Sequence, residues 1–281
     1  MSIKKYVDKI LINKDEKILV TGCTAGIGLE LIKHLAYKDV HIVMLIRNLK
    51  KGEGVIEELK KINPSVKVEM VKYDQSDYES IDSAFEVIKA KHSDFSSIVL
   101  NAGILYPPKG ALSKQGHPLT IETNFLGLRY FMDKLIPLFK DKRYVMQGSL
   151  VAGFKIRKDA DIYNGEYKMF DQYNISKSCV EALYHYYYIN NKDNTFILTE
   201  PGIVATGLFD GFNWFLRNVG GLFMKIFSHS ARKASLTLLK ALDKDSKNGD
   251  YYVPRGIYTI SGYPKNKKFP PKRKREFLIN Q

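Results

Sequence analysis

The sequence predicts an α/β protein built on a single doubly wound parallel sheet with helices on both faces. Short, continuously apolar segments alternate with segments whose apolar residues recur at helical spacing, from Glu16 to about Gly202. The apolar segments end at glycine or polar residues, as strands buried on both faces do. Strict alternation of this kind implies right-handed crossovers, and it places ligand sites at the carboxyl ends of the strands.

The individual elements follow from these patterns. Strands are expected at residues 16–22, 40–47, 66–74, 95–103, 143–153 and 194–202. Helices are expected between them, at residues 28–38, 51–63, 80–92, 123–139 and 171–190. The second helix should stop at Asn63, because the residue before a proline is biased away from helical geometry. The segment 207–230 interrupts the alternation; it is rich in aromatic residues and contains the only tryptophan, so we expect a small helical lid over the substrate.

A chain of 281 residues is long enough for one large domain, and we expect residues 17–264 to form it. Residues 1–16 would be an N-terminal extension. Residues 265–281 would be a solvated basic tail, since they carry seven basic residues and one acidic residue and supply +6 of the net charge of +14. Such a tail could touch anionic lipid together with the lid. Nucleic acid is not an expected partner, because no recognition motif accompanies the charge.

Other residue types limit the class of protein. Cys23 and Cys179 lie far apart and form no C-x-x-C, so neither a disulfide framework nor a zinc site is predicted. The histidines show no metal-ligand spacing, and no metal site is expected. A reducing, cytoplasmic setting fits this usage. The first residues lack the apolar run of a signal peptide, and no run of 18 apolar residues predicts a membrane span. A homo-oligomer is compatible with the sequence.

A glycine-rich turn, "TGCTAGIG", joins the first predicted strand to the first predicted helix. Its glycines allow a tight turn and a close approach of the backbone to a pyrophosphate, which would face the positive end of the helix. The turn lacks G-K-[ST], which disfavours a P-loop nucleotidase. The predicted dinucleotide-binding residues of this turn are Thr21, Gly22, Thr24, Ala25, Gly26, Ile27 and Gly28.

The end of the second strand distinguishes between the two nicotinamide cofactors. An acidic residue at this place would bind the ribose 2′-hydroxyl of NAD, but the sequence has Arg47 and Asn48, with Lys50 and Lys51 nearby. A guanidinium can bind a 2′-phosphate through paired, charge-assisted hydrogen bonds. We therefore expect NADP(H) rather than NAD(H).

Tyr173 and Lys177 form an i,i+4 pair on the predicted helix at 171–190, so their side chains share one face. By itself this spacing does not separate a surface pair from a phenol held beside an ammonium for chemistry. The surrounding motifs decide between the two interpretations.

In order along the chain stand "TGCTAGIG", "YDQSD" (73–77), "NAG" (101–103), "TNFLG" (123–127), Ser149, "YNISK" (173–177) and "EPGIVATG" (200–207). This ordered set resembles the short-chain dehydrogenases/reductases, over residues 17 to about 258. "IRNLKKGE", the wide gap between Ser149 and Tyr173, and "GDYYVPRG" resemble the subgroup of retinol dehydrogenases and steroid or lipid carbonyl reductases. The resemblance implies a Rossmann-type domain and an NADP-dependent oxidoreductase.

The resemblance also implies positions for the cofactor. Asp74 and Gln75 would lie at the adenine, and Asp74 would accept a hydrogen bond from its amino group. Asn101, Ala102 and Gly103 would lie beside the adenosine ribose. The segment that closes over the nicotinamide would consist of Pro201, Gly202, Val204 and Thr206.

For catalysis, the resemblance implies that Tyr173 is the general acid/base and that Lys177 stabilises its phenolate and binds the nicotinamide ribose. Ser149 would donate a hydrogen bond to the substrate oxygen, with Ser176 and Ser178 as alternatives that flank the lysine. Asn124 would hold a water in the proton path; a capping or turn role is its alternative.

The aromatic residues of the lid favour an apolar carbonyl or alcohol substrate, although such residues also occur in ordinary cores. The reaction expected is interconversion of a ketone or aldehyde and an alcohol by hydride transfer. A non-catalytic NADP(H)-binding sensor or scaffold of the same fold is the alternative. The intact set of Ser149, Tyr173 and Lys177 argues against it.

Overall fold

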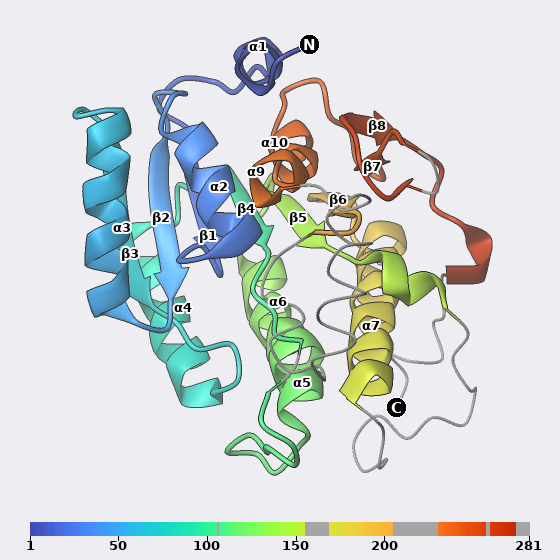
Figure 1. Ribbon diagram of the computed structural model, residues 1–281. Helices are drawn as coiled ribbons and strands as arrows, with labels where there is room; N and C mark the ends of the chain where they lie inside the picture. The colour runs from blue at the N-terminus through green and yellow to red at the C-terminus, as the bar shows by residue number, and fades with distance from the viewer. Residues whose placement is uncertain (106, 155–168, 205–229, 257–258, 274–281) are drawn as a thin grey trace, which may run out of the picture.

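A computed structural model of the protein describes residues 1–105, 107–154, 169–204, 230–256 and 259–273 (Figure 1). Its centre is a sheet with the strand order β3-β2-β1-β4-β5-β6-β7-β8, in which every pair of neighbours is parallel except β7 and β8. The predicted doubly wound α/β fold is confirmed. The strands are β1 (Lys17–Thr21), β2 (His41–Ile46), β3 (Lys67–Lys72), β4 (Ser97–Leu100), β5 (Arg143–Gln147), β6 (Thr195–Thr199), β7 (Tyr251–Pro254) and β8 (Pro264–Asn266).

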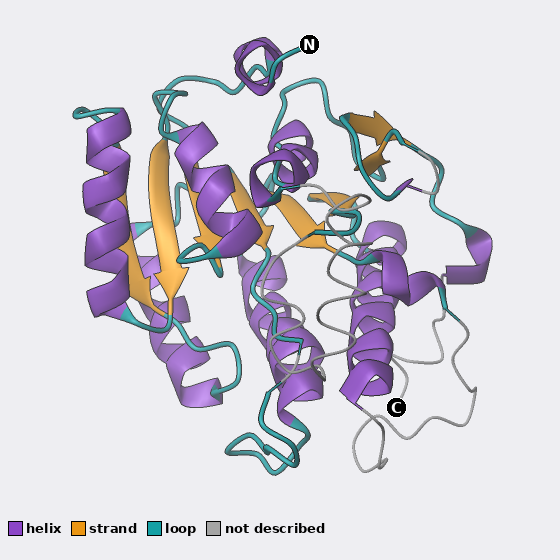
Figure 2. Cartoon of the chain, viewed as in Figure 1, coloured by secondary structure: helices purple, strands orange, loops and turns teal. Residues whose placement is uncertain are grey.

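Helices cover both faces of this sheet (Figure 2). The α-helices are α1 (Ile3–Lys9), α2 (Gly26–Leu35), α3 (Leu49–Ile62), α4 (Tyr78–Lys91), α5 (Leu119–Ile121), α6 (Gly127–Leu138), α7 (Met169–Asn190), α9 (Ala231–Ala234) and α10 (Leu236–Ala241). A π-helical turn, η1 (Glu122–Leu126), precedes α6, and two short 3₁₀ turns are η2 (Leu150–Gly153) and η4 (Pro271–Arg273).

Two hydrophobic clusters, one on each face, hold these layers together. Alternate residues of β1 point to opposite faces, so Leu19 joins the cluster under α4, α6 and α7, while Ile18 and Val20 join the cluster under α2, α3 and α10. All three side chains are fully buried. Continuous apolar strands are therefore required, as the sequence pattern predicted.

Two predicted elements differ from the structure in more than the placement of their end residues. The strand expected over 143–153 ends at Gln147, because Gly148 and Ser149 leave the sheet and Ser149 is the N-cap residue of η2. The helix expected over 123–139 begins in a π-helical turn. Both changes lie at the carboxyl-end side of the sheet, where ligand sites occur in this architecture.

The predicted N-terminal extension packs against the domain. Ser2 caps α1 by accepting a hydrogen bond from the backbone of Lys5 at 3.2 Å. Val7 and Ile10 belong to the same hydrophobic cluster as Ile18 and Val20, with 5% and 4% of their surface exposed. The extension therefore contributes to the core.

The described part of the predicted solvated tail is also folded. Lys265 and Asn266 lie in β8, which pairs antiparallel with β7. The Phe269 ring lies edge-on to those of Tyr184 and Tyr251, and Arg273 is buried. The expectation of a solvated tail is wrong for Phe269 and Arg273, which pack against Tyr251 and bind buried carboxylates, whereas Asn266, Lys267 and Lys268 are exposed. Residues 274–281 lie outside the described residues, as do 155–168 and all of the predicted lid except Ser230.

Within the described ranges, no helix combines the length and apolarity needed to cross a bilayer.

The contribution of the N-terminal segment can be measured with two neighbouring substitutions. Ile10→Ala should lower the free energy of unfolding by about 2–4 kcal/mol, because it removes buried methyl groups and leaves a cavity. Leu11→Ala is the matched control: Leu11 is 46% exposed, and its loss should change stability by less than about 0.5 kcal/mol. Urea denaturation of both variants measures the difference, and equal losses would contradict the packing of this segment.

Candidate active site

A cleft of about 690 Å³ opens at the carboxyl ends of the central strands. There β1 and β4 are neighbours in the sheet, although they are not consecutive strands in the sequence. This is the topological switch point of the sheet, the place where ligands bind in doubly wound folds. The predicted site residues that line the cleft are Gly22, Thr24, Ala25, Gly26, Ile27, Arg47, Asp74, Gln75, Asn101, Ala102, Gly103, Tyr173, Lys177 and Pro201.

The glycine-rich turn between β1 and α2 requires glycine for two separate reasons. Gly22 has a φ of 64°, a backbone conformation that disfavours residues with a Cβ. A Cβ on Gly28 would lie 2.4 Å from the carbonyl oxygen of Gly22, so only glycine permits this close contact of helix and turn. Together these positions leave the turn open on its cleft side, as a pyrophosphate cradle requires.

Thr21 does not line the cleft but ties the two central strand ends together. Its hydroxyl donates to the carbonyl of Val99 at 3.3 Å and accepts from the backbone N–H groups of Asn101 at 3.0 Å and Ala102 at 2.9 Å. The Asn101 side chain in turn donates to the carbonyl oxygens of Thr21 and Gly22. The "NAG" segment and the glycine-rich turn are thus one rigid unit.

Arg47 lies at the end of β2 with its side chain 72% exposed, and its Nε is 3.9 Å from Oδ2 of Asp74. The other oxygen of Asp74 accepts from the backbone and hydroxyl of Ser76, at 3.0 and 2.7 Å. Asn48, in contrast, is used as the N-cap of α3, where its side chain accepts from the backbone of Lys51 at 2.9 Å. Arg47 is among the residues that line the cleft at this strand end.

Gln75 lines the cleft, but its side chain is occupied within the protein. Its amide donates to the carbonyls of Ala102 and Thr123, and its oxygen accepts from the Tyr73 hydroxyl at 3.0 Å. These bonds connect the loop after β3 to the loop after β4. The structure thus shows Gln75 shaping the wall of the cleft.

Tyr173 and Lys177 lie on α7 and both line the same cleft as the glycine-rich turn. Lys177 is 6% exposed, and its Nζ donates to the carbonyl of Gln147 at the end of β5, at 3.0 Å. Burial lowers the pKa of this ammonium to about 8, while the nearby Glu181 acts in the opposite direction. The spacing of one helical turn therefore does place a phenol and a buried amine at a common site.

Asn124 lies in the π-helical turn and is almost fully buried. Its oxygen accepts from the backbone N–H of Ile104 at 2.7 Å, and its amide donates to the Ile104 carbonyl at 2.8 Å and to the Ser176 hydroxyl at 3.0 Å. The side chain thus clamps the loop after β4 onto α7. This loop carries Gly103, where an added Cβ would lie 3.5 Å from the Lys177 ammonium.

Of the three candidate serines, the two on α7 are engaged within the helix region. Ser176 donates to the Tyr173 carbonyl at 2.8 Å, and Ser178 lies 3.5 Å from the Ala152 carbonyl and from Asn174. Ser149 lies just beyond β5, with 9% of its surface exposed. None of the three serines is among the described residues that line the cleft, and the choice of Ser149 stays a prediction.

The segment after β6 is predicted to close over the nicotinamide. Pro201 lines the cleft, whereas Gly202 and Val204 do not line it directly. Gly202 has a φ of 76°, and the next residue, Ile203, donates through its backbone to the carbonyl of Ile260 at 2.9 Å. Thr206 lies outside the described residues.

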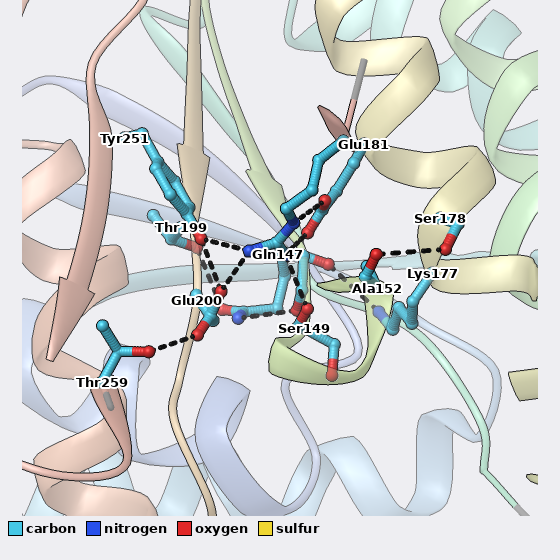
Figure 3. Close-up of polar contacts among 12 residues, drawn as sticks. Gln147, Ser149, Ala152, Lys177, Ser178, Glu181, Thr199, Glu200, Tyr251 and Thr259 are labelled. Carbon is cyan, nitrogen blue, oxygen red and sulfur yellow. Dashed lines mark hydrogen bonds and ion pairs between the residues drawn. The ribbon is translucent and has the colours of Figure 1, made fainter. Parts of the chain in front are cut away.

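Sequence reasoning missed a buried polar network behind the site. In Figure 3, Glu181 and Glu200 flank a cluster that also contains Ser149 and Tyr251. The cation that joins them is Arg273. Glu181 stands four residues after Lys177, so the sequence already indicated that the two side chains share one face of the helix. No pattern in the sequence indicated that Arg273 would be buried beside them.

The Rossmann-type sheet, the glycine cradle at its switch point and the Tyr173–Lys177 pair define the class of nucleotide-binding oxidoreductases. Comparison with known proteins agrees: a family model described as short chain dehydrogenase matches residues 16–212. The chain belongs to the short-chain dehydrogenase/reductase family.

Two curated relatives illustrate the similarity. Human 3-keto-steroid reductase/17-beta-hydroxysteroid dehydrogenase 7 is 33% identical over 144 residues, which cover 50% of this chain and 38% of that protein. A short-chain dehydrogenase/reductase from Penicillium rubens is 28% identical over 221 residues, covering 74% of this chain and 63% of that one. The matches thus span less than two thirds of either relative. The similarity to a steroid reductase agrees with the subgroup resemblance.

Solved structures share the fold at low sequence identity. A short-chain type dehydrogenase/reductase from Mycobacterium ulcerans has a TM-score of 0.70 at 17% identity and covers 91% of this chain and 94% of its own. An alcohol dehydrogenase from Thermococcus sibiricus, solved with 5-hydroxy-NADP, has a TM-score of 0.65 at 20% identity, with 84% of this chain and 94% of its own covered.

The glycine cradle can be tested by comparing two glycines. Gly28→Ala should weaken binding of NADPH by about tenfold or more, equivalent to about 1.4 kcal/mol, because the new methyl group must displace the turn. Gly54→Ala is the control, because nothing lies within 4 Å of a Cβ added there. Nucleotide fluorescence titration measures both affinities; unchanged binding by the folded Gly28→Ala variant would contradict the assignment of the turn.

Proposed function

We propose that the protein is an NADP(H)-dependent oxidoreductase that interconverts an apolar ketone or aldehyde and the corresponding alcohol, with Tyr173 as general acid/base. The observation that carries this proposal is the presence of Tyr173 and a buried Lys177 in the cleft formed by the glycine-rich turn. A phenol and an ammonium beside a dinucleotide cradle are the groups that carbonyl reduction needs from a protein.

The described residues fit a dinucleotide. A Cβ on Gly22 would lie 2.7 Å from the Cα of Ala102, so the glycine brings the turn against the loop after β4 and leaves the cleft side free. The N-terminus of α2 starts at Gly26 and directs its backbone N–H groups to this turn. When bound, the nicotinamide would supply or accept the hydride.

Tyr173 would move the proton. A free phenol has a pKa near 10, so it needs a positive neighbour to act as a base at neutral pH in the direction of alcohol oxidation. Lys177 would be that neighbour, and its position is restricted by the hydrogen bond to Gln147. Because the pKa of Lys177 is lowered to about 8, its charge is present below that pH and is lost as the pH rises through it.

Two further residues would position the reactants. Ser149 would donate to the substrate oxygen and hold it beside the phenol. Asn124, whose side-chain groups bind Ile104 and Ser176, would support the loop and the helix on either side of Lys177. A water in the proton path near Asn124 is part of this proposal.

The cofactor preference would come from Arg47. Its exposed guanidinium lies at the cleft, where it could form charge-assisted hydrogen bonds with a 2′-phosphate. Asp74 is 3.9 Å from it and would bind the adenine while helping to orient the guanidinium.

An apolar substrate is supported by the lining of the cleft and by one relative. Ile104 and Leu105 line the cleft, and Phe154 and Phe170, near Ser149 and Tyr173 in the chain, are 52% and 43% exposed with ring centroids 6.1 Å apart. The name of the human relative refers to 3-keto-steroids. We extend that substrate class, a bulky apolar ketone, to this chain.

The free, buried Cys23 and Cys179 support a reducing, cytoplasmic location. Peripheral contact with a membrane through the lid and the last basic residues, and a homo-oligomer, remain part of the proposal.

The competing function is a nucleotide-binding sensor. A sensor would bind the nucleotide but would not consume it. A panel of ketones and aldehydes, tested once with NADPH and once with NADH, therefore distinguishes the two functions.

Replacement of the predicted proton donor tests the mechanism. Tyr173→Phe should lower kcat by about three orders of magnitude, within the range for loss of a general acid, and leave the Kd for NADPH nearly unchanged. Tyr186→Phe, on the exposed side of the same helix, is the control. Absorbance of NADPH measures turnover, and a Tyr173→Phe enzyme with most of its activity would refute the assignment.

Replacement of the predicted phosphate ligand tests the cofactor preference. Arg47→Ala should raise the Kd for NADPH about ten- to a hundredfold, the loss expected for one or two charge-assisted hydrogen bonds, with little effect on NADH. Lys60→Ala removes an exposed cation from the far end of α3 and controls for general charge. Equal losses for NADPH and NADH would contradict the role of Arg47.

A further inference from the structure

Arg273 is the most fully engaged buried cation in the described part of the chain. Its side chain is 7% exposed, and each of its five N–H groups has an acceptor. Nε donates to Oε2 of Glu181 at 2.7 Å, and Nη1 donates to Oε2 of Glu200 at 3.2 Å and to the Tyr251 hydroxyl at 2.9 Å. Nη2 donates to the Ser149 carbonyl at 2.9 Å and to Oε1 of Glu181.

These acceptors belong to the segments that form the nicotinamide end of the proposed site. Ser149 follows β5, Glu181 is one helical turn beyond Lys177 on α7, and Glu200 immediately precedes the cleft residue Pro201. Figure 3 shows Glu200 to the left of Ser149, Glu181 above it and Lys177 to its right. One guanidinium therefore joins the ends of two strands to the catalytic helix.

The network is also electrostatically coupled to Lys177. Burial raises the pKa of Glu181 to about 7, and Arg273 opposes this shift by its charge and its hydrogen bonds. A negative Glu181 raises the pKa of Lys177, against the effect of burial. Among the described residues, the backbone of Ser149 also hydrogen-bonds Glu181 and lowers its pKa, and the hydroxyls of Tyr251 and Thr259 donate to Glu200 at 2.5 and 3.0 Å.

We propose that Arg273 is a positioning residue of the active site, which acts through Ser149 and Glu181 on the two residues of α7 assigned to proton transfer. The proposal rests on the proposed function, because it gives Arg273 a role in that reaction. It differs from simple structural support in one respect. Structural support alone would make Arg273 necessary for folding but would leave the properties of Lys177 unchanged in the folded protein.

The expected mechanism has a geometric part and an electrostatic part. Without the bond from Nη2, the Ser149 carbonyl and hence the Ser149 hydroxyl would lose a fixed position relative to Tyr173. Without the paired bonds from Arg273, Glu181 would hold its proton to higher pH. Lys177 would then face a neutral neighbour, and its charge would be lost at lower pH.

Two substitutions separate these parts. Arg273→Lys keeps the charge but has three donors for five acceptors, and Arg273→Gln removes the charge. Arg143→Lys is the matched control, because Arg143 is partly buried at the opposite end of β5 and its Nη1 donates to the Leu242 carbonyl at 2.9 Å. The unfolding midpoint of each full-length variant is measured first, to establish that the variant is folded under the assay conditions.

The first readout is turnover with the best carbonyl substrate of the panel. Arg273→Lys should lower kcat about tenfold, equivalent to about 1.4 kcal/mol of activation free energy, while the Kd for NADPH stays within about threefold. Arg143→Lys should keep the wild-type kcat, whatever its effect on the unfolding midpoint.

The second readout does not depend on turnover. Competitive labelling of Lys177 with trace acetic anhydride, followed by mass spectrometry over a range of pH, gives the pKa of that amine in the folded protein. The pKa should decrease in the order wild type, Arg273→Lys, Arg273→Gln, and Arg143→Lys should match the wild type.

The proposal is overturned if Lys177 in folded Arg273→Lys has the wild-type labelling profile, whatever the loss of thermal stability. If the wild type reduces no carbonyl of the panel, the proposed function fails, but the labelling order still decides whether Arg273 acts on Lys177. If Arg273→Gln does not fold, the comparison of Arg273→Lys with Arg143→Lys decides alone.

Discussion

The parallel pairing of β1 with β4 is the constraint on which the whole site depends. The two strands run in register from Ile18 opposite Ser97 to Val20 opposite Val99, so both end at the same edge of the sheet. The hydroxyl of Thr21 then bonds both strand ends, with Val99 as acceptor and the backbone of Asn101 and Ala102 as donors. These bonds hold the two strand ends together, so the glycine-rich turn lies beside the loop after β4, and Tyr173 and Lys177 of α7 line the same cleft.

Much of this architecture could be predicted from the sequence, because its signals are local. Strands buried on both faces need uninterrupted apolar residues, and helices need apolar residues at every third or fourth position. The glycine-rich turn has a steric requirement that only glycine meets, as Gly28 shows. The four-residue spacing of Tyr173 and Lys177 also has a simple geometric meaning once a helix is expected there.

The remaining features depend on contacts between residues far apart in the chain. The pairing of β7 with β8 uses segments without a strong strand pattern, and the bond from Arg273 to Ser149 joins residues 124 positions apart. A basic stretch looks the same in sequence whether it is solvated or buried against carboxyls. Asn48 and Gln75, both predicted to bind the cofactor, illustrate the same difficulty within the site. The side chain of Asn48 caps α3, and the side chain of Gln75 donates to the carbonyls of Ala102 and Thr123.

The separation of Glu181 and Arg273 by 92 residues has a consequence for biosynthesis. Glu181 and Glu200 leave the ribosome well before Arg273 does. During that interval the two carboxyls lack their shared counter-cation, and burying both of them as anions would be costly. The packing of α7 against the ends of β5 and β6 therefore depends on a residue that stands 73 positions after Glu200 in the chain.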